Sequence, residues 1–167
     1  MAWSENLFNE IKKAGIRLCA TLPDSWIADL LIRVEADPDI IHVPVAREEE
    51  AVGVCCGAVA GGTRAAMIIQ NVGAMNSGGA IATLPIAYGI PFLMVISHRG
   101  RLGDKLFYDV EKGRNAAKLL EQVGVQCFPL PSDFTERGSV ADAYALAEAA
   151  QKPVALLITK DSFGADG

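Results

Sequence analysis

The residues Ala65-Ala66-Met67-Ile68-Ile69 form an uninterrupted apolar run, and Gln70-Asn71-Val72-Gly73 follows it directly. A short apolar run of this kind predicts a strand, over 64–71, that is buried on both faces of a sheet. The stretch 72–79 is rich in glycine and predicts a turn that opens a helix. A buried strand followed by such a turn and a helix is typical of a parallel sheet in an α/β protein.

The same alternation of strands and helices continues along the whole chain. Helices are predicted between the strands, for example over 48–60, a stretch of small residues that Gly61-Gly62 closes. The sequence therefore predicts one α/β domain over 1–167, a three-layer αβα arrangement with a six-stranded, mainly parallel sheet. The polar stretch 98–113 has no clear period and predicts a long loop before a helix over 115–123. Further strands are expected at 17–21, 40–45, 91–97, 126–130 and 154–159.

The composition excludes several classes of protein. Hydrophobic residues make up 51% of the 167 residues and charged residues 21%, which excludes an intrinsically disordered chain. A net charge of -5 argues against a nucleic-acid partner. The longest apolar runs, 91–96 and 154–158, are far shorter than the roughly 20 residues of a membrane-spanning helix. No export signal is recognisable at the start, so we expect a cytoplasmic protein without a membrane partner.

Ligands of parallel α/β sheets bind at the carboxyl ends of the strands, so the loops that begin there are the candidate site. These loops begin at Leu22, Ala46, Asn71 and His98. They contain no phosphate-binding loop, no dinucleotide-binding glycine motif and no G-x-S-x-G nucleophile motif. The four cysteines have no C-x-x-C spacing, and no metal site is expected in this chain.

Three consecutive carboxylates, Glu48, Glu49 and Glu50, stand between a predicted strand and a predicted helix. Carboxylates in a first helical turn interact favourably with the helix dipole, which is a sufficient structural reason for all three. Alternatively, one of them faces inward at the strand end, where burial would raise its pKa and make it an acid/base group. Composition does not decide which of the three would do so.

Three motifs together resemble the pyrimidine-binding domain of thiamine-diphosphate-dependent decarboxylases. They are Arg47-Glu48-Glu49-Glu50 with Gly57 nine residues after Glu48, Gln70-Asn71-Val72-Gly73, and Ser97-His98-Arg99-Gly100. Within that family the chain is most similar to sulfopyruvate decarboxylase alpha subunits, and next to the N-terminal part of phosphonopyruvate decarboxylases. The resemblance covers nearly the whole chain and is strongest over 47–100.

The resemblance implies a role for the carboxylates and for the glycine-containing turn. One glutamate of the family hydrogen-bonds N1′ of the aminopyrimidine ring and thereby activates the cofactor. Its match is Glu48, with Glu49 as the alternative if the alignment slips by one residue. Gln70, Asn71, Gly73 and Asn76 would lie beside the aminopyrimidine, Gly73 because it permits close approach of the backbone. Without the resemblance, the same residues are explained equally well as a helix cap and a turn.

The resemblance also implies a substrate site. Asp24 and Ser25 match the family's first active-site loop, although Asp24 is equally well explained as a helix cap. Arg99, together with His98, is expected to bind an anionic tail of the substrate, because a guanidinium can donate two parallel hydrogen bonds to such a group. The alternative is an arginine on the surface at a strand end.

A complete enzyme of this family also needs a diphosphate-binding domain, whose Gly-Asp-Gly motif helps to hold Mg²⁺. That motif is absent from this chain. The resemblance therefore implies an alpha subunit of a two-subunit decarboxylase in a heteromer with several copies of each chain. A separate beta subunit would hold Mg²⁺ and the diphosphate, and the substrate would be a small 2-oxo acid such as sulfopyruvate or phosphonopyruvate. The alternative is a non-catalytic binding or scaffold module that has kept the fold.

Overall fold

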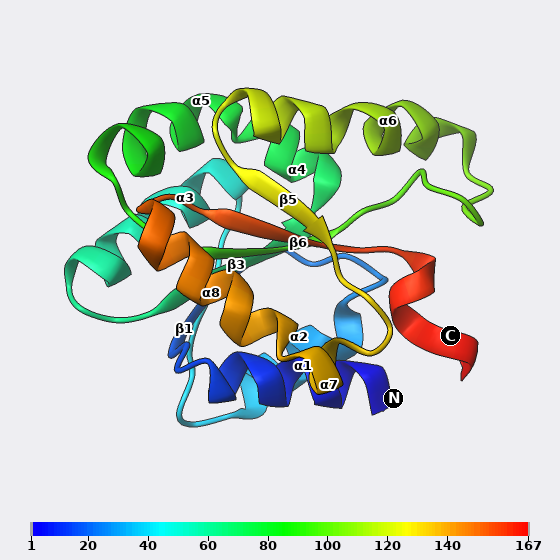
Figure 1. Ribbon diagram of the computed structural model, residues 1–167, viewed down its shortest axis with the longest axis horizontal. Helices are drawn as coiled ribbons and strands as arrows, with labels where there is room; N and C mark the ends of the chain where they lie inside the picture. The colour runs from blue at the N-terminus through cyan, green and yellow to red at the C-terminus, as the bar shows by residue number, and fades with distance from the viewer. Residues whose placement is uncertain (1, 167) are drawn as a thin grey trace.

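The computed structural model describes residues 2–166, in which six parallel strands form one sheet in the order β2-β1-β3-β4-β6-β5 (Figure 1). Every neighbouring pair of strands runs in parallel. The predicted α/β class and the six-stranded sheet are therefore confirmed. The strands are β1 (Leu18–Thr21), β2 (Ile41–Pro44), β3 (Ala65–Gln70), β4 (Leu93–Ser97), β5 (Gln126–Pro129) and β6 (Val154–Ile158).

Helices cover both faces of the sheet, and each helical layer shares an apolar core with the strand residues that face it. Ile68 and Val95 belong to one core, whereas Met67 and Met94 belong to the other, as the alternation of side chains along a strand requires. The first layer holds α1 (Ala2–Lys13), α2 (Ala28–Ala36), α7 (Phe134–Arg137) and α8 (Ser139–Ala150). The second holds α3 (Glu48–Ala60), α4 (Asn71–Asn76), α5 (Gly78–Ile81), the π-helix Ala82–Ile86 and α6 (Phe107–Gln122).

Burial differs between the middle and the edges of the sheet. Strands β1, β4 and β6 are buried throughout, and β3 is buried up to its last residue, Gln70. The expectation of apolar strands buried on both faces is confirmed there. It is wrong for the edge strands β2 and β5, which have no buried residue, because an edge strand has a neighbour on one side only.

Two expected boundaries are wrong. The glycine-rich stretch after β3 is helical from Asn71 onward, so it forms α4 and α5 rather than a turn. Helix α6 begins at Phe107 and takes up part of the loop expected over 98–113. In the loop that remains, the Asp104 carboxylate accepts hydrogen bonds from the backbone N–H groups of Gly100 (2.8 Å) and Leu106 (3.2 Å). Helix α7, at 134–137, was not expected.

The segment after β4 lies directly against α6. A Cβ on Gly113 of α6 would collide with the carbonyl oxygens of Arg99 and Gly100. A Cβ on Gly100, whose φ is +77°, would collide with the carbonyl oxygen of Asp109. Only glycine permits this close backbone approach, which fixes residues 98–100 against the second helical layer.

Within residues 2–166, none of the helices combines the length and the apolar composition needed to cross a membrane.

We predict that Gly113→Ala destabilises the protein by about 1–3 kcal/mol, because the new methyl group has no space between the two backbones. Gly53→Ala is the matched control, also within a helix, and nothing lies within 4 Å of its added Cβ. We expect the control to stabilise the protein by about 0.5–1 kcal/mol. Chemical denaturation of both variants measures the difference, and equal stabilities would contradict the close packing of α6.

Candidate functional site

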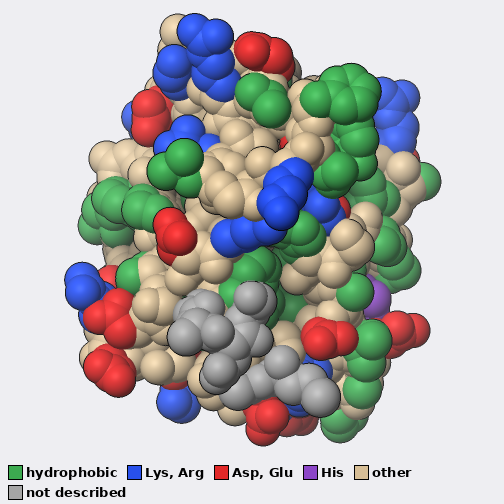
Figure 2. All heavy atoms as spheres, turned by 90° about the vertical axis from the view of Figure 1, so that its right-hand side faces the viewer, with side chains coloured by type: hydrophobic (Ala, Val, Ile, Leu, Met, Phe, Trp, Pro, Cys, Tyr) green, Lys and Arg blue, Asp and Glu red, His purple; other side chains and the backbone are tan. Residues whose placement is uncertain are grey.

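The carboxyl ends of the strands form one face of the molecule, the face seen in Figure 2. Asp24 follows β1, Gln70 ends β3, and Ser97 and Arg99 stand at the end of β4. Gln70 and Ser97 lie side by side because the two strands pair in that register. Lys and Arg side chains gather near the middle of this face, which suits an anionic ligand.

The Asp24 carboxylate accepts hydrogen bonds from four neighbours and is only 7% exposed. The backbone N–H of Trp26 and the Ser97 hydroxyl donate to Oδ1, each at 3.0 Å, and the Gln70 amide donates to Oδ2 at 3.0 Å. Arg99 donates to both oxygens. Asp24 therefore joins the ends of three neighbouring strands.

The Arg99 guanidinium is held on several sides within the protein. Nε lies 3.1 Å from Asp24 Oδ2, and Nη2 lies 2.8 Å from the same oxygen and 2.6 Å from the Ser25 hydroxyl. The group also lies over the Trp26 ring, 4.7 Å from its centroid, a favourable cation–π contact. The two parallel donors that we expected to meet a substrate anion thus face Asp24 in this structure.

The three carboxylates at the start of α3 have different surroundings. Glu50 accepts hydrogen bonds from the backbone N–H groups of Ala46 (3.0 Å) and Arg47 (3.2 Å), so it caps the helix. Glu49 pairs with Arg47 at 3.0 Å. A hydrogen bond with its own backbone N–H and this pairing lower the pKa of the Glu49 carboxyl below its ordinary value. Glu49 is therefore held in its charged form.

The Glu48 side chain extends from the first residue of α3 to Gly73 in α4. It is partly buried and rests on Gly73, where an added Cβ would overlap with its Cγ, Cδ and Oε1 atoms. Gly73 is therefore required for the Glu48 carboxyl to lie where it does. Of the three glutamates, Glu48 is the one that the structure places against the Gln70-Asn71-Val72-Gly73 segment.

Asn71 and His98 are both buried, at 0% and 3% exposure. The Asn71 amide donates to the carbonyl oxygen of Arg99 at 3.0 Å, while its Oδ1 has no hydrogen-bond donor among residues 2–166. His98 Nε2 lies 2.9 Å from the Gly113 carbonyl oxygen, which can only accept, so Nε2 carries the proton. Burial lowers the pKa of His98, which favours the neutral ring.

The remaining expected residues are more open. Ser25 is exposed, and Asn76 is the exposed last residue of α4. From the sequence, no role was assigned to Ser97, which was named only as part of a motif, and Trp26 was not mentioned, although both contact the Asp24–Arg99 pair. Ser97 could have been found from its place at the end of the strand beside Gln70. Within the described chain, no three His, Cys, Asp or Glu side chains come together as a metal site.

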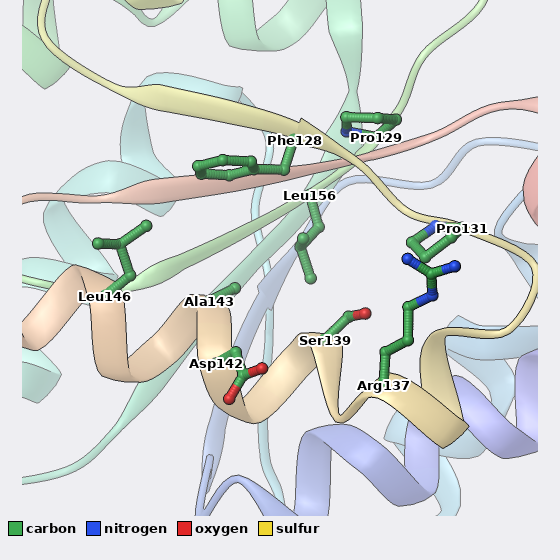
Figure 3. A pocket seen from close by; sticks show the side chains of 9 residues that line it. All are labelled: Phe128, Pro129, Pro131, Arg137, Ser139, Asp142, Ala143, Leu146 and Leu156. Carbon is green, nitrogen blue, oxygen red and sulfur yellow. The ribbon is translucent and has the colours of Figure 1, made fainter.

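A groove of about 340 Å³ lies elsewhere, between α8 and the strands β5 and β6 (Figure 3). Phe128 and Leu156 from the strands face Ala143 and Leu146 of α8 across it. None of its nine lining residues is an expected site residue. The expected site residues lie instead at the face formed by the carboxyl ends of the strands.

Comparisons with known proteins found related sequences and a related fold. No family model matches the sequence. The chain is 37% identical to the sulfopyruvate decarboxylase subunit alpha of Methanococcus maripaludis, over 93% of this chain and 93% of that protein. It is 39% identical to the same subunit of Methanocaldococcus jannaschii, over 72% of each chain. The 2-oxoglutarate:ferredoxin oxidoreductase of Magnetococcus marinus has the same fold, with a TM-score of 0.70 and 16% identity over 94% of this chain and 28% of that chain.

We predict that His98 makes stability depend on pH. Because burial lowers its pKa in the folded state, the unfolded chain binds a proton below about pH 6.5 that the folded chain does not. The contribution of His98 to the free energy of unfolding is therefore fully present above that pH. It is lost as the pH falls from about 6.5 toward the pKa of His98 in the folded protein. His98→Gln, which keeps an N–H donor for Gly113 but does not titrate, should show a flatter decline. Melting temperatures between pH 8 and 5.5 measure this, and identical slopes would contradict it.

Proposed function

We propose that this chain, which belongs to the family of sulfopyruvate decarboxylase alpha subunits, supplies the pyrimidine-side half of a thiamine-diphosphate site. Membership of that family makes the chain a subunit of a 2-oxo acid decarboxylase, a carboxy-lyase. It favours the catalytic alternative over the non-catalytic scaffold. The observation that carries the proposal is the Glu48 carboxyl resting on the bare backbone of Gly73.

The residues around Gly73 fit the aminopyrimidine ring of the cofactor. That ring has ring nitrogens that can share a proton with a carboxyl group and an exocyclic amino group that donates. Glu48 provides the carboxyl group, and the buried Asn71 Oδ1 is an acceptor without a donor in residues 2–166. Gly73 leaves the space beside its backbone to the Glu48 carboxyl group, which would face the ring from there. Gln70 and Asn76 stand at the two ends of the same segment and complete the proposed cofactor site.

The role proposed for Glu48 is to share a proton with N1′ of the aminopyrimidine. When bound, the cofactor supplies an electron sink for the carbanion left by decarboxylation. Glu48 is suited to its task because it is partly buried and has neither the salt bridge of Glu49 nor the capping bonds of Glu50. A carboxyl shielded from water forms a stronger hydrogen bond with the ring than an exposed one.

The substrate that we propose is a small anionic 2-oxo acid, sulfopyruvate before phosphonopyruvate, because the relatives named above are sulfopyruvate decarboxylase subunits. Arg99 would meet its anionic group, with Ser25 and Asp24 in the same loop cluster. His98 would contribute by holding residues 98–100 against Gly113 of α6.

The proposed partner is a beta subunit that holds the diphosphate and Mg²⁺. The relatives are named as alpha subunits, which implies a second kind of subunit. This chain has no Gly-Asp-Gly motif to hold the metal. The cofactor would lie between the two kinds of subunit in a heteromer containing several copies of each.

We predict that Glu48→Gln lowers kcat of the two-subunit complex about 100-fold or more, because the amide cannot exchange a proton with the ring. Glu49→Gln and Glu50→Gln are matched controls on the same helical turn, and each should keep kcat within about threefold. Steady-state release of CO₂ from sulfopyruvate measures all three variants. Normal turnover by Glu48→Gln would falsify the role assigned to Glu48, and a selective loss in Glu49→Gln would move that role to Glu49.

We also predict that the purified chain alone releases no CO₂ from sulfopyruvate with thiamine diphosphate and Mg²⁺. Adding the beta subunit should restore turnover in proportion to complex formation, because the diphosphate then has its own binding domain. Gel filtration combined with the CO₂ assay tests this expectation. Full activity of the isolated chain would contradict the half-site arrangement.

A further inference from the structure

The Asp24 carboxylate has no capacity left for a substrate. A carboxylate offers about four lone-pair positions, and Asp24 already accepts from Trp26, Ser97, Gln70 and Arg99. Its buried negative charge would also repel an anionic 2-oxo acid. A direct bond from Asp24 to such a substrate is therefore unfavourable in both hydrogen bonding and charge.

The same contacts place the Arg99 guanidinium in one orientation. Its Nε–Nη2 edge faces Asp24, Nη2 also donates to Ser25, and the group lies over the Trp26 ring. Among residues 3–163, whose side chains the structure describes, no acceptor lies within hydrogen-bond distance of the third nitrogen, Nη1. An arginine held on one edge by a carboxylate loses little side-chain entropy when another acceptor binds it.

We propose that Asp24 is a positioning residue of the decarboxylase site, which holds Arg99 so that Nη1 meets the anionic tail of the substrate. Asp24 acts through Arg99 and does not contact the substrate. Through its bond to the Gln70 amide, Asp24 also links the loop after β1 to the segment that runs from Gln70 to Gly73. This inference rests on the proposed function, since it names the contact that selects the substrate of that site.

A double-mutant cycle in the assembled two-subunit complex tests the proposal. KM and kcat are measured with sulfopyruvate, and with pyruvate as a 2-oxo acid without a second anion, for Asp24→Asn, Arg99→Met and the double variant. We expect each single variant to raise KM for sulfopyruvate at least tenfold and KM for pyruvate much less. The double variant should lie within twofold of Arg99→Met alone. Single effects that multiply in the double variant would overturn the proposal, because Asp24 would then act independently of Arg99.

Trp26 provides a readout that does not depend on activity. The chain has two tryptophans, so in a Trp3→Phe background Trp26 is the only one. Asp24→Asn should change the Trp26 fluorescence emission of the full chain in the same direction as Arg99→Met, because both remove the guanidinium from its place over the ring. Unchanged emission in Asp24→Asn would overturn the positioning role.

Two further variants keep the test decisive if Asp24→Asn folds poorly. Ser25→Ala removes an acceptor of Nη2 from an exposed position and should raise KM for sulfopyruvate twofold or more. An unchanged KM would overturn the proposal. Asp37→Asn is the matched control, because Asp37 pairs with Lys12 at 2.7 Å at the opposite end of the sheet, before β2. An equal rise in KM in the control would also overturn it. Failure of the proposed function can be distinguished from failure of this inference. If the proposed function is wrong, Glu48→Gln keeps its turnover, whatever the Asp24 variants show.

Discussion

The contact between Glu48 and Gly73 is the constraint on which the proposed site depends. Helix α3 begins at Glu48, after β2, and α4 begins two residues before Gly73, directly after β3. Both helices therefore start where the strands have their carboxyl ends. The absence of a side chain at Gly73 lets the carboxyl of one helix rest on the backbone of the other. Any larger residue would push Glu48 outward, where water would weaken the interaction with a bound ring.

A second interaction, the Asp24–Arg99 ion pair, joins the loops around that contact. The two side chains are 7% and 9% exposed, and a buried pair is favourable only when further hydrogen bonds satisfy both partners. Here Trp26, Ser97, Gln70 and Ser25 provide these bonds. The carbonyl oxygen of Arg99 in turn accepts a hydrogen bond from the Asn71 amide. This bond connects the segment after β4 to the segment from Gln70 to Gly73, where we propose that the cofactor binds. Removing one charge would leave the other buried and unpaired, which typically costs about 3–5 kcal/mol.

The sequence predicted the sheet well because its central strands are continuous apolar runs, such as 65–69. Helix α3 ends at Ala60, as expected, because Gly61 and Gly62 follow it. The start of α6 could not be predicted, because Phe107, Tyr108 and Val110 are exposed and give no amphipathic period. Local motifs identified Glu48 and the Gln70–Gly73 segment as candidates. The mutual pairing of Asp24 and Arg99, which are 75 residues apart, is a tertiary contact that no local pattern contains.

The most direct test of the central claim compares thiamine diphosphate with an analogue in which carbon replaces N1′ of the aminopyrimidine. Both are supplied to the two-subunit complex containing either the unmodified chain or the Glu48→Gln variant, and CO₂ release is measured. We predict that the unmodified complex prefers thiamine diphosphate by about 100-fold or more, and that the variant shows nearly equal, low rates with both compounds. An equally strong preference in the variant would show that another group contacts N1′ and would contradict the account.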